Sequence, residues 1–494
     1  MPIADSIVPR HFRAATAIGL ALCMGFVIFM AYFVFFGQSL RLDEAQSLWQ
    51  TSHSVAKIFN VIGQDVHVPF YHLMLYFWQL FFGNGVTTAR LLSLLFYALV
   101  IPAMYLLGSL VFDQRTAWYA TLLITVSPFL QWYGNEVRMY SLFALIVILN
   151  QYFFLRIYRS PTPAAWAGYG VTIVLGLFTH YFFAFSILTQ VVFFLIYHRD
   201  FERGAIYKFL TVAAIGLMFF IPWVLYVYSL GTLSNSAPLI APPTSINLFN
   251  AFSEFLFGFQ DDRVNTILVS LWPLITLFGF LAMRENKRLQ PEVVYFFMSF
   301  LLPVVLIFGA SLAFRPIFLT RYLVFTLPPL YLFISWLFST YPAALSRLCK
   351  TGLILVMLCT LGIEAESATI PVKEDFRAAA AYLSQNAAQD DAVAVSAPFI
   401  IYPVEYYYSG AAPLTTLPVW DRFANGPVPP FDESKLPDEL KQIGDHRQNL
   451  WILFSYDQGY EERLRLYLDT HYQRERVVPF SPGMTLYEYK LRYD

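Results

Sequence analysis

Long apolar runs separated by short polar connections fill the chain up to about residue 364. A run of about twenty apolar residues is long enough to cross a bilayer as one helix. We therefore predict about eleven transmembrane spans. They lie at 15–37, 90–112, 116–134, 137–158, 164–179, 181–197, 206–230, 264–283, 293–314, 320–340 and 346–364. The first run lacks a small-residue cleavage motif, so we expect it to be retained as an anchor.

The apolar stretch 67–82 (HVPFYHLMLYFWQLFF) has a different character. It is short and contains His72 and Gln79, which favours a helix that lies at the membrane interface. If it does not span, the basic connections all fall on one side, which the positive-inside rule makes cytoplasmic. The N-terminus is then cytoplasmic, and residues 38–89 form a large outer loop with two juxtamembrane helices.

Beyond residue 367 the pattern changes to that of a water-soluble domain. Helix-like segments (EDFRAAAAYLSQNA, EERLRLYLDTHY) alternate with strand-like ones (AVAVSA, IIYPVEYYYS, NLWILFS, TLYEYKL), and residues 412–437 are rich in proline. We predict two domains: an α-helical polytopic membrane domain at 1–367 and an extracytoplasmic α/β domain at 368–494. The proline-rich segment is expected to be an irregular surface loop.

Composition supports a membrane protein and narrows its chemistry. Hydrophobic residues make up 57% of the 494 residues and charged residues 13%, with a net charge of −1; soluble proteins average about 25% charged residues. The three cysteines lie in or beside apolar runs, so no disulfide framework is expected. Motifs for a phosphate loop, a serine nucleophile or a zinc protease are absent, as is Asp-x-Asp. No nucleic-acid partner is expected.

The first outer loop carries an unusual density of ionisable groups. Asp43 and Glu44 follow the first span closely, and Asp65 and His67 lie at a polar turn. A positioned carboxylate at the outer surface is a candidate general base. The alternative is that Asp43 only caps the helix that begins there, and that His67 is an ordinary turn residue.

Other outward connections add polar groups to the same side of the membrane. Glu136, Arg138 and Tyr140 follow the third span, His180 lies between two spans, and Arg321 precedes the tenth. Structural roles are open, because ion pairs staple helix ends and arginines there often reach to the interface. Together, however, arginines and carboxylates favour an anionic lipid head group, since arginine forks suit phosphate oxygens.

Several motifs resemble those of the glycosyltransferase-C superfamily, in particular bacterial relatives of dolichyl-phosphate-mannose protein mannosyltransferases and of the lipid A aminoarabinose transferase. The similar segments are DEAQS, DVHVPFYHLMLYFWQLFFG, ARLLSLLFYAL, SPFLQWYGNEVRMYSL, THYFF, TRYLVFTLPPLYLF and KEDFRAAAAYL. They occur in order along nearly the whole membrane region. The resemblance implies a multi-pass protein of the cell (inner) membrane with its C-terminal domain on the periplasmic or extracellular side.

The resemblance also implies roles for the candidate residues. The donor would be a polyprenyl-phosphate-linked sugar, transferred with inversion to an acceptor hydroxyl of a protein, lipid or polysaccharide, with Asp43 as general base. The acceptor site and cavity would be lined by Glu44, Asp65, His67, Glu136, Tyr140 and His180, and the donor phosphate would be bound by Arg138 and Arg321. No cofactor or metal is expected. Some members use a divalent cation, but Glu254, Asp261 and Asp262 are interpreted as a solvated amphipathic edge.

Two other functions stay open from the sequence. A transporter or flippase of lipid-linked sugars also needs many spans and an anion-binding cavity, although ion-coupled carriers place charges near the middle of the bilayer. Here the charges of the predicted spans lie near their ends. A non-catalytic protein that binds a glycan through its C-terminal domain is the second alternative.

Overall fold

The computed structural model describes residues 10–65, 67–231, 241–269, 277, 281, 290–367, 369–422 and 428–491. The chain forms two compact units. Unit 1 comprises Met1–Phe36, Val66–Leu230 and Ala237–Ser367, and unit 2 comprises Gly37–Asp65, Gly231–Ser236 and Ala368–Asp494. The sequence predicted that the whole loop 38–89 belongs to the membrane domain. Its first part, Gly37–Asp65, groups instead with the C-terminal residues.

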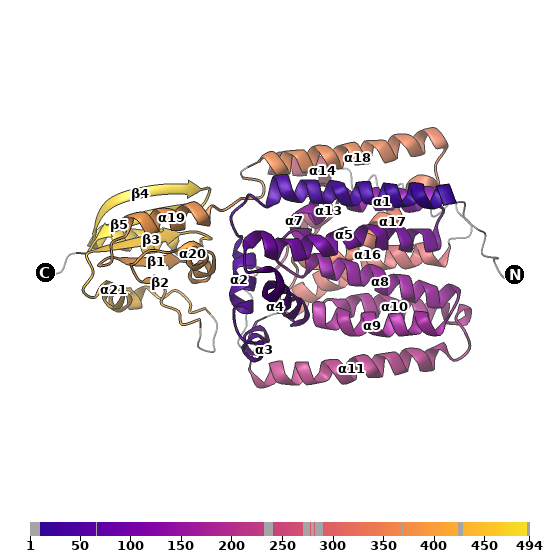
Figure 1. Cartoon of the computed structure of the whole chain (residues 1–494), viewed down its shortest axis with the longest axis horizontal. Helices are drawn as coiled ribbons and strands as arrows, with labels where there is room; N and C mark the ends of the chain where they lie inside the picture. Colours follow the sequence, from indigo (N-terminus) through magenta and orange to yellow (C-terminus); the bar gives the residue numbers. More distant parts are fainter. Residues whose placement is uncertain are drawn as a thin grey trace. The chain divides into compact units, whose positions relative to one another are not determined.

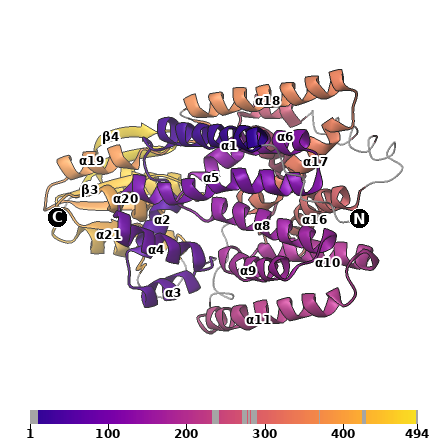
Figure 2. The same ribbon diagram turned by 45° about the vertical axis from the view of Figure 1, so that its right-hand side comes forward.

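Unit 1 is a bundle of long apolar helices that run side by side (Figures 1 and 2). Its elements are α1 (Arg10–Met30), the π-helical turn η1 (Ala31–Phe35), α4 (Phe70–Phe82), α5 (Val86–Val111), α6 (Gln114–Thr125), α7 (Pro128–Gly134), α8 (Tyr140–Arg159), α9 (Pro163–Thr179), α10 (Phe183–Tyr197), η2 (His198–Asp200), α11 (Ala205–Ser229), α13 (Ser245–Phe257), α14 (Asp262–Val269), α16 (Pro291–Ala313), η3 (Thr320–Thr326), α17 (Leu327–Ser339) and α18 (Ala343–Glu366).

Among the described residues of unit 1, seven helical segments are long and apolar enough to cross a membrane, so the chain is a multi-pass membrane protein. They are Ala14–Val34, Val86–Val111, Tyr140–Arg159, Ala205–Ser229, Pro291–Ala313, Thr320–Ser339 and Ala343–Glu366. The predicted spans at 164–179 and 181–197 coincide with the shorter α9 and α10. Most of the span predicted at 264–283 lies outside the described residues. The total of eleven therefore stays a prediction.

The span predicted at 116–134 is broken into two helices. α6 ends at Thr125, and Ser127 starts α7 by accepting a hydrogen bond from Leu130 N at 3.2 Å, with Pro128 in the first turn. This serine-proline pair is a strong helix-start signal. A Cβ on Gly134 would lie 2.9 Å from the Tyr97 ring, so glycine is needed where α7 approaches α5. The short α7 thus brings the segment after it close to α5.

A network of uncharged polar side chains ties the helices together inside unit 1. Gln190 Nε2 donates to Asn150 Oδ1 at 2.6 Å, Tyr169 OH donates to Gln190 Oε1 at 2.8 Å, and Asn150 Nδ2 donates to Thr172 Oγ1 at 3.0 Å. All four side chains are buried. Hydrogen bonds between membrane helices stabilise their packing by about 0.6 kcal/mol each. The network links α8, α9 and α10 without placing a charge in their middle.

Unit 2 contains a five-stranded mixed sheet with helices packed around it (Figure 1). The strand order is β2-β1-β3-β5-β4; β1 is parallel to β2 and β3, and β5 is antiparallel to β3 and β4. Its elements are α2 (Leu42–Thr51), α3 (Val55–Gly63), α19 (Phe376–Asn386), β1 (Ala392–Ser396), η4 (Pro398–Ile400), α20 (Ile401–Tyr407), β2 (Leu414–Thr416), η5 (Glu433–Lys435), α21 (Leu436–Gly444), β3 (Asn449–Phe454), α22 (Glu461–His471), β4 (Gln473–Ser481) and β5 (Met484–Lys490).

Three predictions for this unit were wrong in detail. The strand-like segment IIYPVEYYYS forms α20, because Pro403 is tolerated in a first turn and Ile401 and Val404 bury one helical face. The proline-rich segment 412–437 includes the edge strand β2 and begins α21. The strand β4 was not predicted, because its residues are mostly exposed and charged at one end.

The loop 38–89 holds three helices where two were predicted. α2 and α3 belong to unit 2 and are separated at 52–54, where Ser52 ends one helix and Ser54 precedes the next. α4 belongs to unit 1 and has 13 residues. At 1.5 Å per residue it is about 20 Å long, shorter than the hydrocarbon core of a bilayer. An interfacial placement of α4 remains our interpretation.

Candidate functional site

His67 and Arg138 meet inside unit 1. Arg138 Nη1 lies 3.0 Å from His67 Nε2, and Arg138 is buried. Because a guanidinium only donates hydrogen bonds, His67 Nε2 must accept, and a neutral His67 then carries its proton on Nδ1. The His67 ring also stacks on His72, with centroids 5.9 Å apart. A buried arginine is thus fixed by an uncharged imidazole.

The backbone around Arg138 is held by neighbouring helices. The hydroxyl groups of Tyr71 in α4 and Ser93 in α5 form a hydrogen bond of 2.7 Å. Ser93 Oγ also donates a hydrogen bond to the carbonyl oxygen of Arg138 at 3.4 Å. The Arg138 N–H donates to the Glu136 carbonyl at 2.6 Å. Side chains from α4 and α5 therefore position the segment between α7 and α8 that the sequence singled out. Glu136 and Tyr140 are buried beside it in the chain.

His180 follows the last residue of α9 and is kept neutral. Burial, together with a smaller contribution from the nearby His67, lowers the pKa of His180 from 6.5 to about 3. The Nδ1 atom accepts a hydrogen bond from Phe182 N at 3.1 Å, which places the proton of the neutral ring on Nε2. The ring stacks on Phe143 at 4.8 Å. His180 is therefore a rigid neutral group near His67.

Arg321 joins this group of residues through Tyr322. The Arg321 guanidinium lies 5.7 Å from the centroid of the Tyr322 ring, and His180 also packs against that ring, at 5.4 Å between centroids. A guanidinium over an aromatic face is attracted by the ring electrons. Tyr322 thus links His180 at the end of α9 with Arg321 of η3, a role that was not predicted from the sequence.

Glu254 contradicts the interpretation of the 231–263 connection as a solvated edge. Its carboxyl group forms a hydrogen bond with Thr320, the residue before Arg321, and burial raises its pKa to about 7. The Glu254 residue as a whole is only half-buried. The raised pKa therefore indicates that its carboxyl group lies in more apolar surroundings than the exposure of the whole residue suggests. Among the described residues, no group of three His, Cys, Asp or Glu side chains could hold a metal ion.

The three remaining candidates lie in unit 2. The alternative in which Asp43 caps the helix was wrong: α2 begins at Leu42, two residues before Glu44, and Glu44 accepts the hydrogen bond from the Arg41 N–H at 3.0 Å. Glu44 therefore closes the first turn of α2, as a carboxylate at that position commonly does. Asp43 is left at the second position of the helix, free of this capping role.

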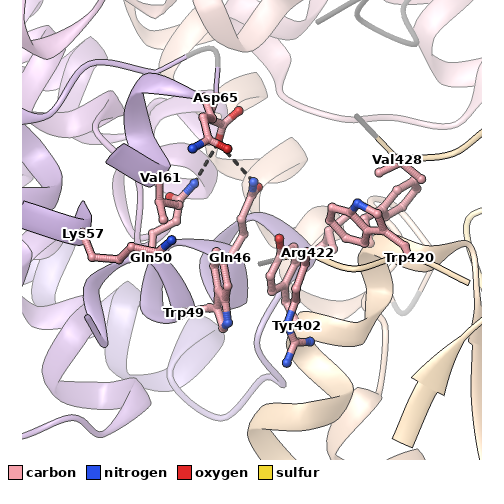
Figure 3. Close-up of a pocket in the computed structure, with 13 residues that line it drawn as sticks. Gln46, Trp49, Gln50, Lys57, Val61, Asp65, Tyr402, Trp420, Arg422 and Val428 are labelled. Atoms are coloured by element: carbon pink, nitrogen blue, oxygen red, sulfur yellow. Dashed lines mark hydrogen bonds between the residues drawn. The ribbon is translucent and has the colours of Figure 1, made fainter. Parts of the chain in front are cut away.

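Asp65 closes a pocket within unit 2. Its Oδ2 atom accepts hydrogen bonds from Gln50 Nε2 at 2.8 Å and from Gln46 Nε2 at 3.1 Å (Figure 3). The pocket has a volume of about 310 Å³. Its walls come from α2, α3, α20 and the segment around Trp420, and it is lined by Leu42, Gln46, Trp49, Gln50, Lys57, Val61, Gln64, Asp65, Phe399, Tyr402, Trp420, Arg422 and Val428.

The candidate residues thus fall into two groups. His67, Glu136, Arg138, Tyr140, His180 and Arg321 lie in unit 1, and Asp43, Glu44 and Asp65 lie in unit 2. Apart from Asp65, which was predicted to line the acceptor cavity and does line the pocket, the sequence did not predict the contributions of the pocket residues or those of Tyr322 and Glu254. His72 had a signal, since a histidine in an apolar helix is uncommon. The pocket residues had none, because Trp49 and Trp420 are distant in sequence.

Comparison with known proteins identifies the fold. Residues 66–226 match the family model described as dolichyl-phosphate-mannose-protein mannosyltransferase. The structure is similar to that of ArnT from Cupriavidus metallidurans in the apo state, with a TM-score of 0.64 and 14% identity over 97% of this chain and 98% of that one. No curated protein matches the chain. The chain therefore has the glycosyltransferase-C fold, and the resemblance predicted from its motifs is confirmed.

Two further similar structures contain a lipid phosphate. ArnT from Cupriavidus metallidurans bound to undecaprenyl phosphate has a TM-score of 0.58 and 12% identity, over 96% of this chain and 98% of that one. AglB from Archaeoglobus fulgidus, an archaeal oligosaccharyltransferase in complex with an inhibitory peptide and a dolichol-phosphate, has a TM-score of 0.51 and 12% identity, over 95% of this chain and 74% of that one. The likeness to these proteins extends over both units of the chain.

Proposed function

We propose that this protein is a membrane glycosyltransferase that moves a sugar from a polyprenyl-phosphate-linked donor to an acceptor hydroxyl at the outer face of the cell (inner) membrane. The observation that carries the proposal is the Arg138–His67 pair in a chain with the glycosyltransferase-C fold. An imidazole acceptor fixes the guanidinium without cancelling its charge. A preorganised cation of this kind suits the phosphate of the donor.

In this mechanism the acceptor hydroxyl attacks the anomeric carbon of the donor sugar. The new carbon–oxygen bond forms as the bond between the anomeric carbon and the phosphate oxygen breaks, so the configuration inverts. The hydroxyl proton passes to the Asp43 carboxylate, and the leaving lipid phosphate keeps the electron pair. Arg138 and Arg321 stabilise the negative charge that grows on the phosphate in the transition state.

The roles of the neighbouring residues follow from their contacts. His67 acts as a positioning residue for Arg138, and neutral His180 adds no charge that competes for the phosphate. Glu44 holds the start of α2 and so orients Asp43 on that helix. No cofactor enters these steps. The N-terminus is placed in the cytoplasm, and unit 2 on the outer side.

The alternative of an ion-coupled carrier finds less support. In the described parts of the predicted spans, charged residues lie toward the helix ends, as with Arg90 in α5, Lys208 in α11 and Glu292 in α16. The central polar network of α8, α9 and α10 consists of amides and hydroxyls. Proton- and ion-coupled carriers usually place ionisable groups near the middle of the bilayer.

The test is donor turnover by the purified protein in lipid nanodiscs. Wild type and Asp43→Asn are incubated with radiolabelled polyprenyl-phosphate sugars and a membrane extract as the acceptor source. Loss of a general base slows such reactions by about 10²- to 10⁴-fold. Turnover of one donor by wild type, slowed to this extent in a normally folded Asp43→Asn variant, supports the enzyme. Turnover unchanged in the variant contradicts the role of Asp43. Movement of the donor across the membrane of liposomes that contain the protein, without sugar transfer, contradicts the enzyme.

A further inference from the structure

We propose that the pocket of unit 2 holds a sugar residue of the acceptor, so that the acceptor of the reaction is a carbohydrate. The inference rests on the proposed function and deepens it by naming the acceptor class. An aromatic wall, a polar wall and the helix that carries Asp43 support it, and all three belong to unit 2.

The first wall consists of aromatic rings. Trp49 and Tyr402 lie 5.0 Å apart between centroids, and Tyr402 meets Trp420 edge-on at 6.1 Å. Aromatic side chains offer large rigid surfaces that the apolar C–H face of a pyranose ring can cover. Three such rings line the pocket, and together they offer a surface on which one face of a sugar ring can pack.

Arg422 makes this wall rigid. Its guanidinium lies 5.8 Å from the ring centroids of both Trp49 and Tyr402 and pairs with Glu405. The Arg422 side chain is only 8% exposed. Because its charge is balanced by Glu405, Arg422 positions the rings and is not required as an anion ligand. The aromatic surface is therefore held in place before any ligand arrives, which reduces the entropic cost of binding.

The second wall is polar and has an unused acceptor. Gln46 and Gln50 both turn their amide N–H groups to Asp65 Oδ2, as Figure 3 shows. This arrangement fixes the orientation of Gln50, whose Oε1 atom is buried and has no hydrogen-bond partner among the described residues. A buried polar atom without a partner is costly. A sugar hydroxyl in the pocket would donate to it, and Lys57 on the same wall is a donor for a second sugar oxygen.

The geometry of α2 places Asp43 next to this wall. Leu42, Gln46, Trp49 and Gln50 line the pocket and share one face of the helix. With 3.6 residues per turn, Asp43 and Gln50 are separated by only about 20° around the helix axis. Asp43 therefore lies at the edge of the pocket-lining face, two turns before Gln50. A sugar held by Gln50 and Trp49 has hydroxyl groups on the side of α2 from which the base projects.

These features favour a carbohydrate over a serine or threonine side chain of a protein. A single side-chain hydroxyl would satisfy Gln50 but would leave the three rings uncovered. The volume of about 310 Å³ lies at the lower end of the range of small-molecule sites, which suits a single sugar residue of a larger glycan. A peptide chain would need an extended groove to be recognised.

The experiment measures glycoside binding without any donor. Full-length protein in nanodiscs is titrated with methyl glycosides of glucose, galactose, mannose and N-acetylglucosamine, and binding is followed by saturation-transfer difference NMR. We expect at least one glycoside to receive saturation mainly on one ring face. Trp49→Ala and Gln50→Leu should each weaken this binding on the order of tenfold.

The matched control is Tyr406→Ala, which removes an exposed aromatic side chain of α20 that does not line the pocket. Thermal unfolding confirms that each variant is folded, and Trp420→Ala replaces Trp49→Ala if the latter is not. Absence of saturation for every glycoside with wild type, or equal binding by wild type and both pocket variants, would overturn the inference. Because no donor is present, this result is independent of whether the proposed sugar transfer occurs.

Discussion

The Nη1 atom of Arg138 lies 3.0 Å from the Nε2 atom of His67, and the two residues are 71 positions apart in the chain. The contact brings a residue before α4 onto the segment between α7 and α8. Both were singled out in the sequence as separate outward connections. Their meeting in unit 1 places a fixed positive charge where the proposed mechanism needs one for the donor phosphate.

Substitutions of His67 should show whether its hydrogen bond to Arg138 is needed to position the guanidinium. His67→Gln keeps a carbonyl oxygen that accepts from Arg138, whereas His67→Leu leaves the buried guanidinium without this acceptor. We expect His67→Leu to raise the donor KM and lower kcat/KM by about tenfold to a hundredfold, with His67→Gln retaining most of the activity. Steady-state kinetics with the donor identified for wild type measure both effects.

The control for this prediction is Arg138→Lys, which keeps the charge but loses the planar fork. It should lower kcat/KM at least as much as His67→Leu. If His67→Gln and His67→Leu are equally impaired, the hydrogen bond to Arg138 is not what His67 contributes. Activity of Arg138→Lys equal to that of wild type would remove Arg138 from the donor site.

The two adjacent acids of α2 should behave differently. Glu44 accepts the Arg41 N–H and thereby stabilises the start of α2, so Glu44→Ala should reduce stability by about 1 kcal/mol. Asp43→Asn preserves the shape of the side chain and should leave the thermal midpoint unchanged while it slows turnover by about 10²- to 10⁴-fold. Differential scanning fluorimetry of both variants in the same nanodiscs measures the difference. A lower midpoint for Asp43→Asn than for Glu44→Ala would reverse these assignments.

Some secondary-structure elements of this protein can be predicted from the sequence, and others cannot. Helices such as α5 and α18 are encoded by local runs of apolar residues, so the sequence predicts them well. Capping of α2 by Asp43 was the alternative to its role as general base, and the sequence could not tell which of the two adjacent acids reaches back to the Arg41 N–H. The aromatic residues of α20 favour a strand, but the segment forms a helix because Ile401 and Val404, three residues apart, are buried on one helical face. Tertiary packing therefore determines the conformation of this segment.

The candidate site shows the same limit. Single residues such as Arg138 and His180 stand out because polar groups are rare in an apolar chain. The partners that give them a defined state, His67 and Tyr322, are brought to them only by the fold. The pocket of unit 2 unites α2 with residues near 402 and 420, and no local pattern predicts such a meeting.

Glu254 should make stability depend on pH near neutrality. Its pKa is raised by burial from 4.5 to about 7 in the folded protein. A raised folded-state pKa favours folding below the unfolded pKa, and this contribution is lost as the pH rises through about 7. We therefore expect the thermal midpoint of wild type to fall between pH 5 and pH 8 by more than that of Glu254→Gln, each compared at constant ionic strength.

Other raised carboxyl pKa values act in the same direction, as those of Glu439 and Glu488 do. The comparison with Glu254→Gln isolates the single residue, because the other groups titrate equally in both proteins. Glu433→Gln, which removes an exposed glutamate of unit 2, is the matched control. Identical pH profiles for wild type and Glu254→Gln would show that Glu254 ionises as an ordinary surface glutamate.

Asp391 should be a principal stabiliser of unit 2. It is buried and lies at the start of β1. Its Oδ1 accepts from the backbone and side-chain nitrogens of Asn449 at 3.2 and 2.9 Å, and its Oδ2 accepts from Ala388 N at 2.9 Å and Trp451 Nε1 at 3.1 Å. One carboxylate thus joins the loop before β1 to the neighbouring strand β3. Hydrogen bonds to a charged group contribute more than neutral ones.

Asp391→Ala leaves the Trp451 indole N–H buried without its acceptor, and we expect unit 2 to lose about 3 kcal/mol of stability. Amide hydrogen exchange of the peptide 449–454 measures this loss directly, since the strand opens with unit 2. Asp390→Ala is the control, because the neighbouring side chain is exposed. Exchange in β3 should accelerate by about two orders of magnitude in Asp391→Ala and remain unchanged in Asp390→Ala. Equal exchange in the two variants would mean that strand pairing alone holds β3 to β1.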